Sequence, residues 1–225
     1  MTLLQASYRR PHAGAGPTPT HPSSLRPIDA SVVLRADTGE ALTLDLGRWH
    51  DPATAEEQEV LAGVDGPVID LGCGPGRLVV SLASHRVPAL GIDSSASAVG
   101  LARKRGATVL QRDLFEPLPG EGRWATALLF DGNVGIGGDP SRLLARCRQL
   151  TGGRGQVVAE VGPPGTGWRC LTAWFERDEL RGEPFKWAVV GADAIGALAG
   201  SAGLTVATLR EMPSGRWFAH LEAAR

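Results

Sequence analysis

Short runs of apolar residues recur along the middle of the chain, separated by stretches with helical spacing. The runs cover residues 68–71, 87–92, 108–110, 124–130 and 156–161. Because they are apolar at nearly every position instead of alternating, they predict parallel strands covered on both faces. Between them, apolar residues recur at every third or fourth position, which predicts helices. The pattern indicates an α/β fold with a parallel sheet between two layers of helices.

The alternation of strands and helices stops at Gly-Pro-Pro-Gly, residues 162–165. Residues 168–176 and 185–190 alternate loosely, and we expect a pair of extended segments that cross the mouth of the sheet. A short helix at 193–201 precedes two final strands, which we expect to form an antiparallel hairpin over 204–210 and 216–221. The predicted fold is a Rossmann-like, doubly wound mixed sheet of about seven strands with helices on both faces and this C-terminal hairpin.

The N-terminal part has a different composition. Residues 1–28 are rich in Pro, Gly, Ser, Thr and His and show almost no apolar pattern. Such a segment cannot bury enough surface to offset its ordering entropy, so we expect a disordered tail. The domain is predicted to span 29–225. Its cap at 29–62 ends in a helix that starts at Asp51 and Pro52, and 162–192 forms an extended insertion on the substrate side.

The most specific motif follows the first strand of the sheet. It reads Asp70-Leu71-Gly72-Cys73-Gly74-Pro75-Gly76, and a helix opens at about Arg77. Glycines at alternate positions allow positive φ angles and a close approach of the backbone to a ligand, and the free N–H groups of the helix N-terminus attract negative groups. The dinucleotide fingerprint requires a third glycine where this chain has Arg77. The loop therefore predicts a nucleotide-type cradle of another kind.

The pattern Asp-x-Gly-x-Gly-x-Gly resembles the first motif of class I S-adenosylmethionine-dependent methyltransferases, and the strand and helix order over about 60–223 resembles the same family. The resemblance implies S-adenosyl-L-methionine as the cofactor, with its methionine end held by Asp70. It also implies ribose binding by an acid after the second strand and adenine binding by an acid after the third. The cofactor-binding residues predicted in this way are Asp70, Gly72, Cys73, Gly74, Gly76, Asp93, Ser94, Asp113, Leu114 and Asp131. A lid formed by residues 8–12 over the cofactor is the alternative to a disordered tail.

Methyl transfer from a sulfonium requires alignment of a nucleophile and exclusion of water. Candidates for a general base must lie near the strand tips, and they are Asp131, His50 and Glu160. Asp131 has the alternative role of capping the turn that follows it. No metal is expected, because the ligand set of the catechol methyltransferases is incomplete around Asp131 and Asn133.

The acceptor pocket is expected among aromatic residues outside the cofactor core. Tryptophan offers a large rigid face and one donor, which suits a flat, aromatic or cyclic small molecule. Arg169 or Lys186 would bind an acidic substituent or lie at the surface. The pocket candidates, for which plain core packing is the alternative, are Trp49, Trp168, Trp174, Phe175 and Trp187.

The predicted function is therefore methyl transfer to an O or N atom of a small molecule by in-line displacement. One alternative is a catalytically silent regulator or scaffold that binds the cofactor with the same fold. Another is an NAD(P)-dependent oxidoreductase, since an acid at the position of Asp93 suits both enzyme classes. The displaced third glycine and the lack of a Tyr-x-x-x-Lys pair disfavour that reading.

Composition narrows the class of partner. The net charge of −1 gives no electrostatic reason to expect nucleic acid. No apolar stretch approaches membrane-spanning length, and the N-terminus lacks the apolar core of a signal peptide. Cys73, Cys147 and Cys170 are far apart and are expected to be reduced thiols. We expect a cytoplasmic protein, monomeric or homodimeric, without a membrane partner.

Overall fold

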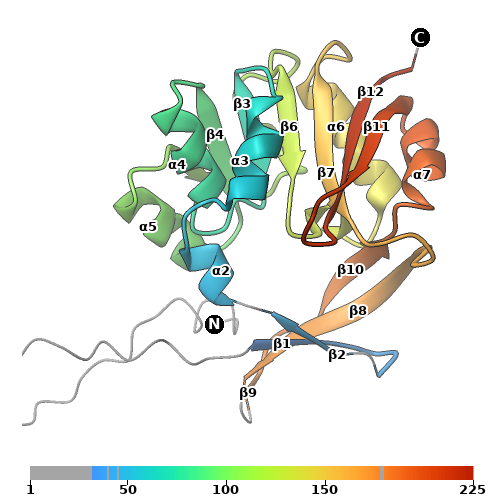
Figure 1. The fold of residues 1–225 in the computed structure, drawn as a ribbon. Coiled ribbons are helices and arrows are strands. Elements are labelled where there is room, and N and C mark those ends of the chain that lie inside the picture. The colour runs from blue at the N-terminus through green and yellow to red at the C-terminus, as the bar shows by residue number, and fades with distance from the viewer. Residues whose placement is uncertain (1–31, 40, 45, 178–179, 225) are drawn as a thin grey trace, which may run out of the picture.

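The structure is a computed structural model that describes residues 32–39, 41–44, 46–177 and 180–224. Its main sheet contains seven strands, in chain order β3 (Val68–Leu71), β4 (Ala89–Asp93), β5 (Val109–Gln111), β6 (Thr126–Leu129), β7 (Gln156–Val161), β11 (Leu204–Glu211) and β12 (Trp217–Ala223). Across the sheet their order is β11-β12-β7-β6-β3-β4-β5 (Figure 1). The strands from β5 to β7 pair in parallel, whereas β12 lies antiparallel to both β7 and β11. The predicted mixed sheet with a C-terminal antiparallel hairpin is confirmed.

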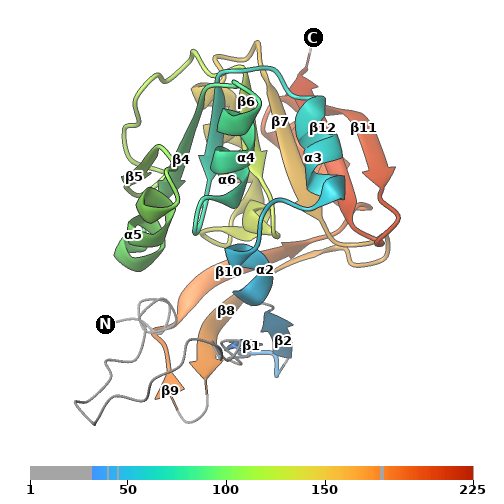
Figure 2. The ribbon, with the colours of Figure 1, turned by 60° about the vertical axis from the view of Figure 1, so that its left-hand side comes forward.

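Helices cover both faces of this sheet (Figures 1 and 2). Successive residues of a strand point to opposite faces, so a strand buried on both sides contributes to two clusters. Ile69 and Leu71 pack with Leu143 of α6, whereas Val68 packs with Leu61 of α3 and Leu78 of α4. This explains the continuous apolar runs of the sequence. The helices that form the two layers are α3 (Ala55–Ala62), α4 (Arg77–Ser84), α5 (Ala96–Lys104), α6 (Pro140–Leu150) and α7 (Ile195–Ser201).

The N-terminal cap corrects one prediction. The helix predicted to start at Asp51 and Pro52 begins only at Ala55, as α3, and its cap is Thr54. A short helix that was not predicted, α2 (Leu46–His50), precedes it. The Thr54 hydroxyl accepts a hydrogen bond from the Glu57 N–H at 3.2 Å, and the Glu57 carboxylate accepts one from the Thr54 N–H at 2.9 Å. This reciprocal capping box satisfies two N-terminal donors, which explains why the helix begins here and not at Asp51.

A second sheet lies beyond the carboxyl ends of the parallel strands (Figures 1 and 2). It joins segments far apart in the sequence, since Leu34 pairs with Phe175. The extended character of residues 168–176 and 185–190 was predicted, but their union with residues 32–36 and 41–44 into one sheet was not. Its strands, all antiparallel, are β1 (Val32–Ala36), β2 (Ala41–Leu44), β8 (Trp168–Arg177), β9 (Leu180–Arg181) and β10 (Phe185–Val190), in the order β10-β8-β1-β2 with β9 against β8.

The predicted tail at 1–28 and the alternative lid at 8–12 lie outside the described residues. The boundaries of the cap and of the insertion stay predictions. In the part of the chain that the structure describes, no helix has both the length and the apolar character needed to cross a membrane.

Candidate functional site

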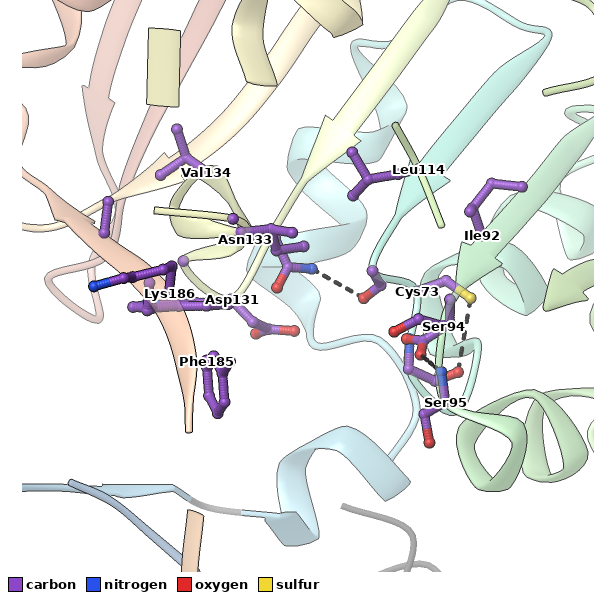
Figure 3. A pocket seen from close by; sticks show the side chains of 18 of the residues that line it. Cys73, Ile92, Ser94, Ser95, Leu114, Asp131, Asn133, Val134, Phe185 and Lys186 are labelled. Atoms are coloured by element: carbon purple, nitrogen blue, oxygen red, sulfur yellow. Dashed lines mark hydrogen bonds between the residues drawn. The ribbon is translucent and has the colours of Figure 1, made fainter. Parts of the chain in front are cut away.

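A cavity of about 900 Å³ opens between the carboxyl edge of the main sheet and the second sheet. Its walls come from the glycine loop after β3, the end of β4, the loops after β5 and β6, the end of β7 and one face of the second sheet. Figure 3 shows side chains of residues that line the cavity, among them Cys73, Asp131 and Phe185. Open α/β sheets bind ligands at this edge, so the cavity is the natural candidate site.

The glycine loop contributes two of its glycines to the cavity wall. Gly72 and Gly74 have φ angles of 74° and 53° and line the cavity. A Cβ at Gly72 would lie 2.6 Å from Nδ2 of Asn133, so the close packing of Asn133 against the loop requires a glycine here. Gly76 does not line the cavity. A Cβ there would lie 2.9 Å from the Cβ of Ala107 and 3.0 Å from that of Ala102, so Gly76 permits close packing of α4 on α5.

The Asp93 carboxylate holds this loop in place from the tip of β4. One of its oxygens accepts a hydrogen bond from the Gly74 N–H at 2.8 Å, and the other accepts one from the Ser95 N–H at 2.8 Å. Burial raises the pKa of Asp93, and these two N–H groups lower it. Asp93, Ser94 and Cys73 all line the cavity, as their predicted role requires.

The next wall is the loop after β5. Asp113 and Leu114 line the cavity together with Phe115, and the Phe115 N–H donates to Oδ1 of Asp113 at 2.9 Å. Arg142 stacks over the Phe115 ring with its guanidinium carbon 4.2 Å from the ring centroid. The loop therefore offers one exposed carboxylate and an apolar surface side by side.

Asp70, like Gly76, is a predicted cofactor residue that lies outside the cavity wall. It is 2% exposed and does not line the cavity, because its position on β3 directs it to the face that carries α3 and α4. Burial raises its pKa to about 7, an effect that Arg77 opposes. Its Oδ2 atom is buried without a hydrogen-bond partner among the described residues. The role of Asp70 at the methionine end stays a prediction.

A buried cluster of alternating charges borders the cavity, and sequence reasoning missed most of it. Arg77, the first residue of α4, binds both oxygens of Asp131 with Nη2, at 2.9 and 2.8 Å, and binds Glu57 at 2.8 Å. Arg216 binds Glu160 at 2.8 and 2.6 Å and Glu57 at 2.9 Å. Arg48 of α2 completes the cluster at 3.2 Å from Glu57 and 3.4 Å from Asp131. An arginine directly after the glycine loop was the available signal, but it does not identify its partners.

The three catalytic candidates separate into a pair and an outlier. Asp131 and Glu160 both line the cavity, and the Asp131 N–H donates to Glu160 at 2.7 Å. Burial raises the pKa of Asp131, whereas Arg77 lowers it. Among the described residues, the Asp131 carboxylate accepts its hydrogen bonds from Arg77 and not from the turn that follows it. His50 does not line the cavity, and its carbonyl accepts from Arg105.

The wall formed by the second sheet is aromatic. Phe175 of β8 and Phe185 and Trp187 of β10 line the cavity, with ring centroids 5.1 and 6.1 Å apart in succession. Of the five aromatic residues predicted for the pocket, Trp49, Phe175 and Trp187 line the cavity. Trp168 and Trp174 do not, because they occupy alternate strand positions and point to the opposite face of the sheet.

The two basic residues suggested for an acidic substituent also separate. Lys186 lines the cavity, but its Nζ donates to Thr172 at 3.0 Å and Figure 3 shows the side chain directed away from Asp131. Arg169 is not among the lining residues. Within the described ranges, no group of three or more His, Cys, Asp or Glu side chains is arranged to hold a metal ion.

Comparison with known proteins gives a consistent set of similarities. Residues 57–121 match the family model described as methionine biosynthesis protein MetW. Over 92 residues the chain is 38% identical to the ribosomal RNA small subunit methyltransferase C of Alcanivorax borkumensis, a match that covers 38% of this chain and only 25% of that relative.

Two solved structures illustrate the similarity of fold. A SAM-dependent methyltransferase from Bacteroides fragilis, in complex with S-adenosylhomocysteine, has a TM-score of 0.72 at 18% identity, covering 87% of this chain and 88% of that one. The 1,6-didemethyltoxoflavin-N1-methyltransferase of Burkholderia thailandensis has a TM-score of 0.57 at 18% identity, covering 80% and 83%.

Proposed function

We propose that this chain, which has the fold of the class I S-adenosylmethionine-dependent methyltransferases, transfers a methyl group from S-adenosylmethionine to an O or N atom of a small molecule. One observation carries the proposal. The glycine loop is fixed by the Asp93 carboxylate and presents its backbone to a cavity at the carboxyl edge of the sheet. That arrangement suits a nucleoside cofactor, because glycine admits close approach and the carboxylate lies where a ribose binds.

The residues present fit this cofactor. A side chain at Gly72 would clash with Asn133, so the shape of the loop depends on glycine, and the cavity of about 900 Å³ is large enough for a nucleoside cofactor beside a small acceptor. Asp93 and Ser94 would hold the ribose. Asp113 and Leu114 would hold the adenine, one by its carboxylate and the other by packing on the ring.

When bound, S-adenosylmethionine supplies a methyl group already activated by its sulfonium. The protein's residues then orient the acceptor and exclude water. Phe175, Phe185 and Trp187 offer the acceptor an apolar wall opposite the polar edge of the main sheet. Such a wall favours a flat aromatic or cyclic molecule over a strongly charged one.

Asp131 is the best-placed group to take a proton from the acceptor, because it lines the cavity and burial raises its pKa. Both of its oxygens already bind Arg77, so proton uptake would weaken that ion pair. Glu160 binds Arg216 with both oxygens and also accepts the Asp131 N–H, so its role is to position Asp131 and not to contact a ligand. His50 lies outside the cavity and is not proposed as a base.

The cofactor is tested by calorimetric titration with S-adenosylhomocysteine, with NADH in parallel. We expect binding of S-adenosylhomocysteine and its loss, by at least about tenfold, in the Asp93→Ala variant, since both the ribose contact and the loop anchor are removed. Asp139→Ala is the matched control. Asp139 also accepts a backbone N–H, that of Arg142 at 3.0 Å, but caps α6 outside the cavity.

Binding of NADH in place of S-adenosylhomocysteine would reassign the loop to a nicotinamide enzyme. If the cofactor binds, release of S-adenosylhomocysteine is then measured with a panel of phenols, aromatic amines and cyclic amines. Cofactor binding with no turnover across that panel would favour a silent binding protein of the same fold.

A further inference from the structure

Within the charge cluster beside the cavity, a chain of hydrogen bonds runs from Arg216 in the C-terminal hairpin through Glu160 to Asp131. Arg216 precedes β12 and is largely buried, with its side chain 12% exposed. Its guanidinium grips both oxygens of Glu160, and Oε2 of Glu160 accepts the Asp131 N–H. The three residues come from three separate segments, and their contacts converge on the backbone of Asp131.

The backbone of Asp131 needs such support. Its φ angle is 56°, in the left-handed region that residues with a Cβ seldom adopt. The hydrogen bond from its N–H to Glu160 holds the peptide in this orientation, and Arg77 holds the carboxylate. The carboxylate is thus fixed against the start of α4, next to the glycine loop.

The position of Asp131 along the sheet identifies what it faces. β6 pairs with β3, so the residues that follow β6 lie beside the glycine loop. Asp93 ends β4 and Asp113 follows β5, and these two strands lie on the other side of β3. If the proposed function is correct, Asp93 and Asp113 mark the adenosine end of the cofactor. Asp131 therefore lies at the opposite end, which carries the sulfonium.

We propose that Arg216 is a positioning residue that, through Glu160, holds the Asp131 carboxylate against the positively charged reacting centre of the cofactor. Arg216 itself does not line the cavity. This inference rests on the proposed function, and it adds a role for the C-terminal hairpin in the recognition of the sulfonium charge.

The hairpin is anchored well enough to serve this role. The Ser214 N–H donates to Glu56 of α3 at 2.8 Å, and the Arg216 carbonyl accepts from the Met212 N–H at 2.7 Å. The Arg216 guanidinium also lies 4.9 Å from the ring centroid of Phe218. The turn is therefore fixed to α3 on one side and to the charge cluster on the other.

The test compares two cofactor analogues that differ in charge at the reacting centre. S-adenosylhomocysteine has a neutral sulfur there, whereas sinefungin has a protonated amine. Both dissociation constants are measured by calorimetry at about pH 8, where carboxylates are ionised. We expect the preference for sinefungin, expressed as the ratio of the two constants, to fall about fivefold in Asp131→Asn. In Arg216→Met we expect a fall of at least about twofold, because the loss of the Glu160 support outweighs the removal of a positive charge that itself lies 3.9 Å from Asp131.

The matched control is Arg210→Met. Arg210 lies in the same hairpin and also pairs with a glutamate of α3, Glu59, but the pair is exposed and remote from the cavity. Its ratio should stay within about twofold of the wild type. Equal losses in Arg210→Met and Arg216→Met would overturn the proposal, because a general loosening of the hairpin would then explain both.

An unchanged ratio in Arg216→Met or in Asp131→Asn, with S-adenosylhomocysteine still bound, overturns this inference alone. If Arg216→Met does not fold, Arg216→Lys decides. Its single ammonium cannot reproduce the two parallel bonds that Nε and Nη2 of Arg216 make to Glu160, so a drop of at least about twofold is expected and a wild-type ratio refutes the proposal. Failure of the wild-type protein to bind S-adenosylhomocysteine overturns the proposed function and this inference with it.

Discussion

The substitution Glu57→Gln tests whether the charge cluster stabilises the fold. Glu57 is fully buried, and its Oε1 atom accepts from Arg77 at 2.8 Å, Arg216 at 2.9 Å and Arg48 at 3.2 Å. Glutamine preserves the size of the side chain and an acceptor oxygen for the Thr54 cap. The substitution removes the charge, so three guanidiniums are left with two carboxylates.

Loss of one partner from a buried ion pair costs about 3–5 kcal/mol, and because glutamine retains an acceptor we expect a loss of about 3 kcal/mol in the free energy of unfolding. For a chain of this size, that loss lowers the melting temperature by about 6–12 °C. The matched control is Glu59→Gln on the same helix. Glu59 is half exposed and pairs with exposed Arg210, so its loss should cost less than about 1 kcal/mol.

The pH dependence gives a second readout. Burial raises the pKa of Glu57, but Arg77, the Thr54 N–H and Arg216 outweigh it, so the pKa lies below its usual range. The charge of Glu57 therefore contributes stability above its unfolded pKa of about 4.3, and the contribution is lost as the pH falls through the lower folded pKa. In urea titrations the gap between wild type and Glu57→Gln should narrow in acid. A loss within about 1 kcal/mol of that of Glu59→Gln at neutral pH would refute the reasoning.

Three further predictions follow from single contacts. Gly76→Ala should cost about 2 kcal/mol in urea denaturation because its Cβ has no room, whereas Gly106→Ala, also at positive φ but with nothing within 4 Å, should cost about 1 kcal/mol. The pKa of Asp70 is raised to about 7 in the folded protein, so the stability of the wild type falls as the pH rises from the unfolded pKa of about 4 towards 7. The variant Asp70→Asn lacks this titration. Its free energy of unfolding, relative to that of the wild type, should therefore rise by at least about 1 kcal/mol between about pH 5 and 8. Phe185→Ala should raise the KM for an acceptor about tenfold without changing S-adenosylhomocysteine affinity, and Trp174→Ala, on the other face of the sheet, should leave both unchanged.

The elements of the main sheet were predictable because their signals are local. Each buried strand shows as an apolar run, and the glycine loop, Asp93 and Asp113 follow strands at the positions where a doubly wound sheet gathers its ligand contacts. The structure brings all three to one cavity. The start of α3 was misplaced because Asp51 and Pro52 form a plausible cap, whereas the Thr54 box makes two hydrogen bonds.

The second sheet was not predictable to the same degree. Trp174 and Phe175 are adjacent, and the sequence alone does not decide which of them faces a ligand. That choice depends on the register between β1 and β8, which sets Leu34 opposite Phe175 across more than a hundred residues of chain. A shift of one position would exchange the two faces of the strand. Aromatic content therefore predicted a wall, but only the pairing of distant strands selects its members.

The charge cluster shows how a mismatch in a motif becomes informative. In the dinucleotide fingerprint the third glycine permits close packing of the helix, and here Gly76 provides such packing one position earlier. The next position is then free to carry a side chain, and that side chain is Arg77, which is 5% exposed. A buried guanidinium requires anionic partners, and Glu57 and Asp131 both accept hydrogen bonds from its Nη2 atom. A buried arginine after a glycine loop thus predicts carboxylates beside the loop, although the segments that provide them must be learned from the fold.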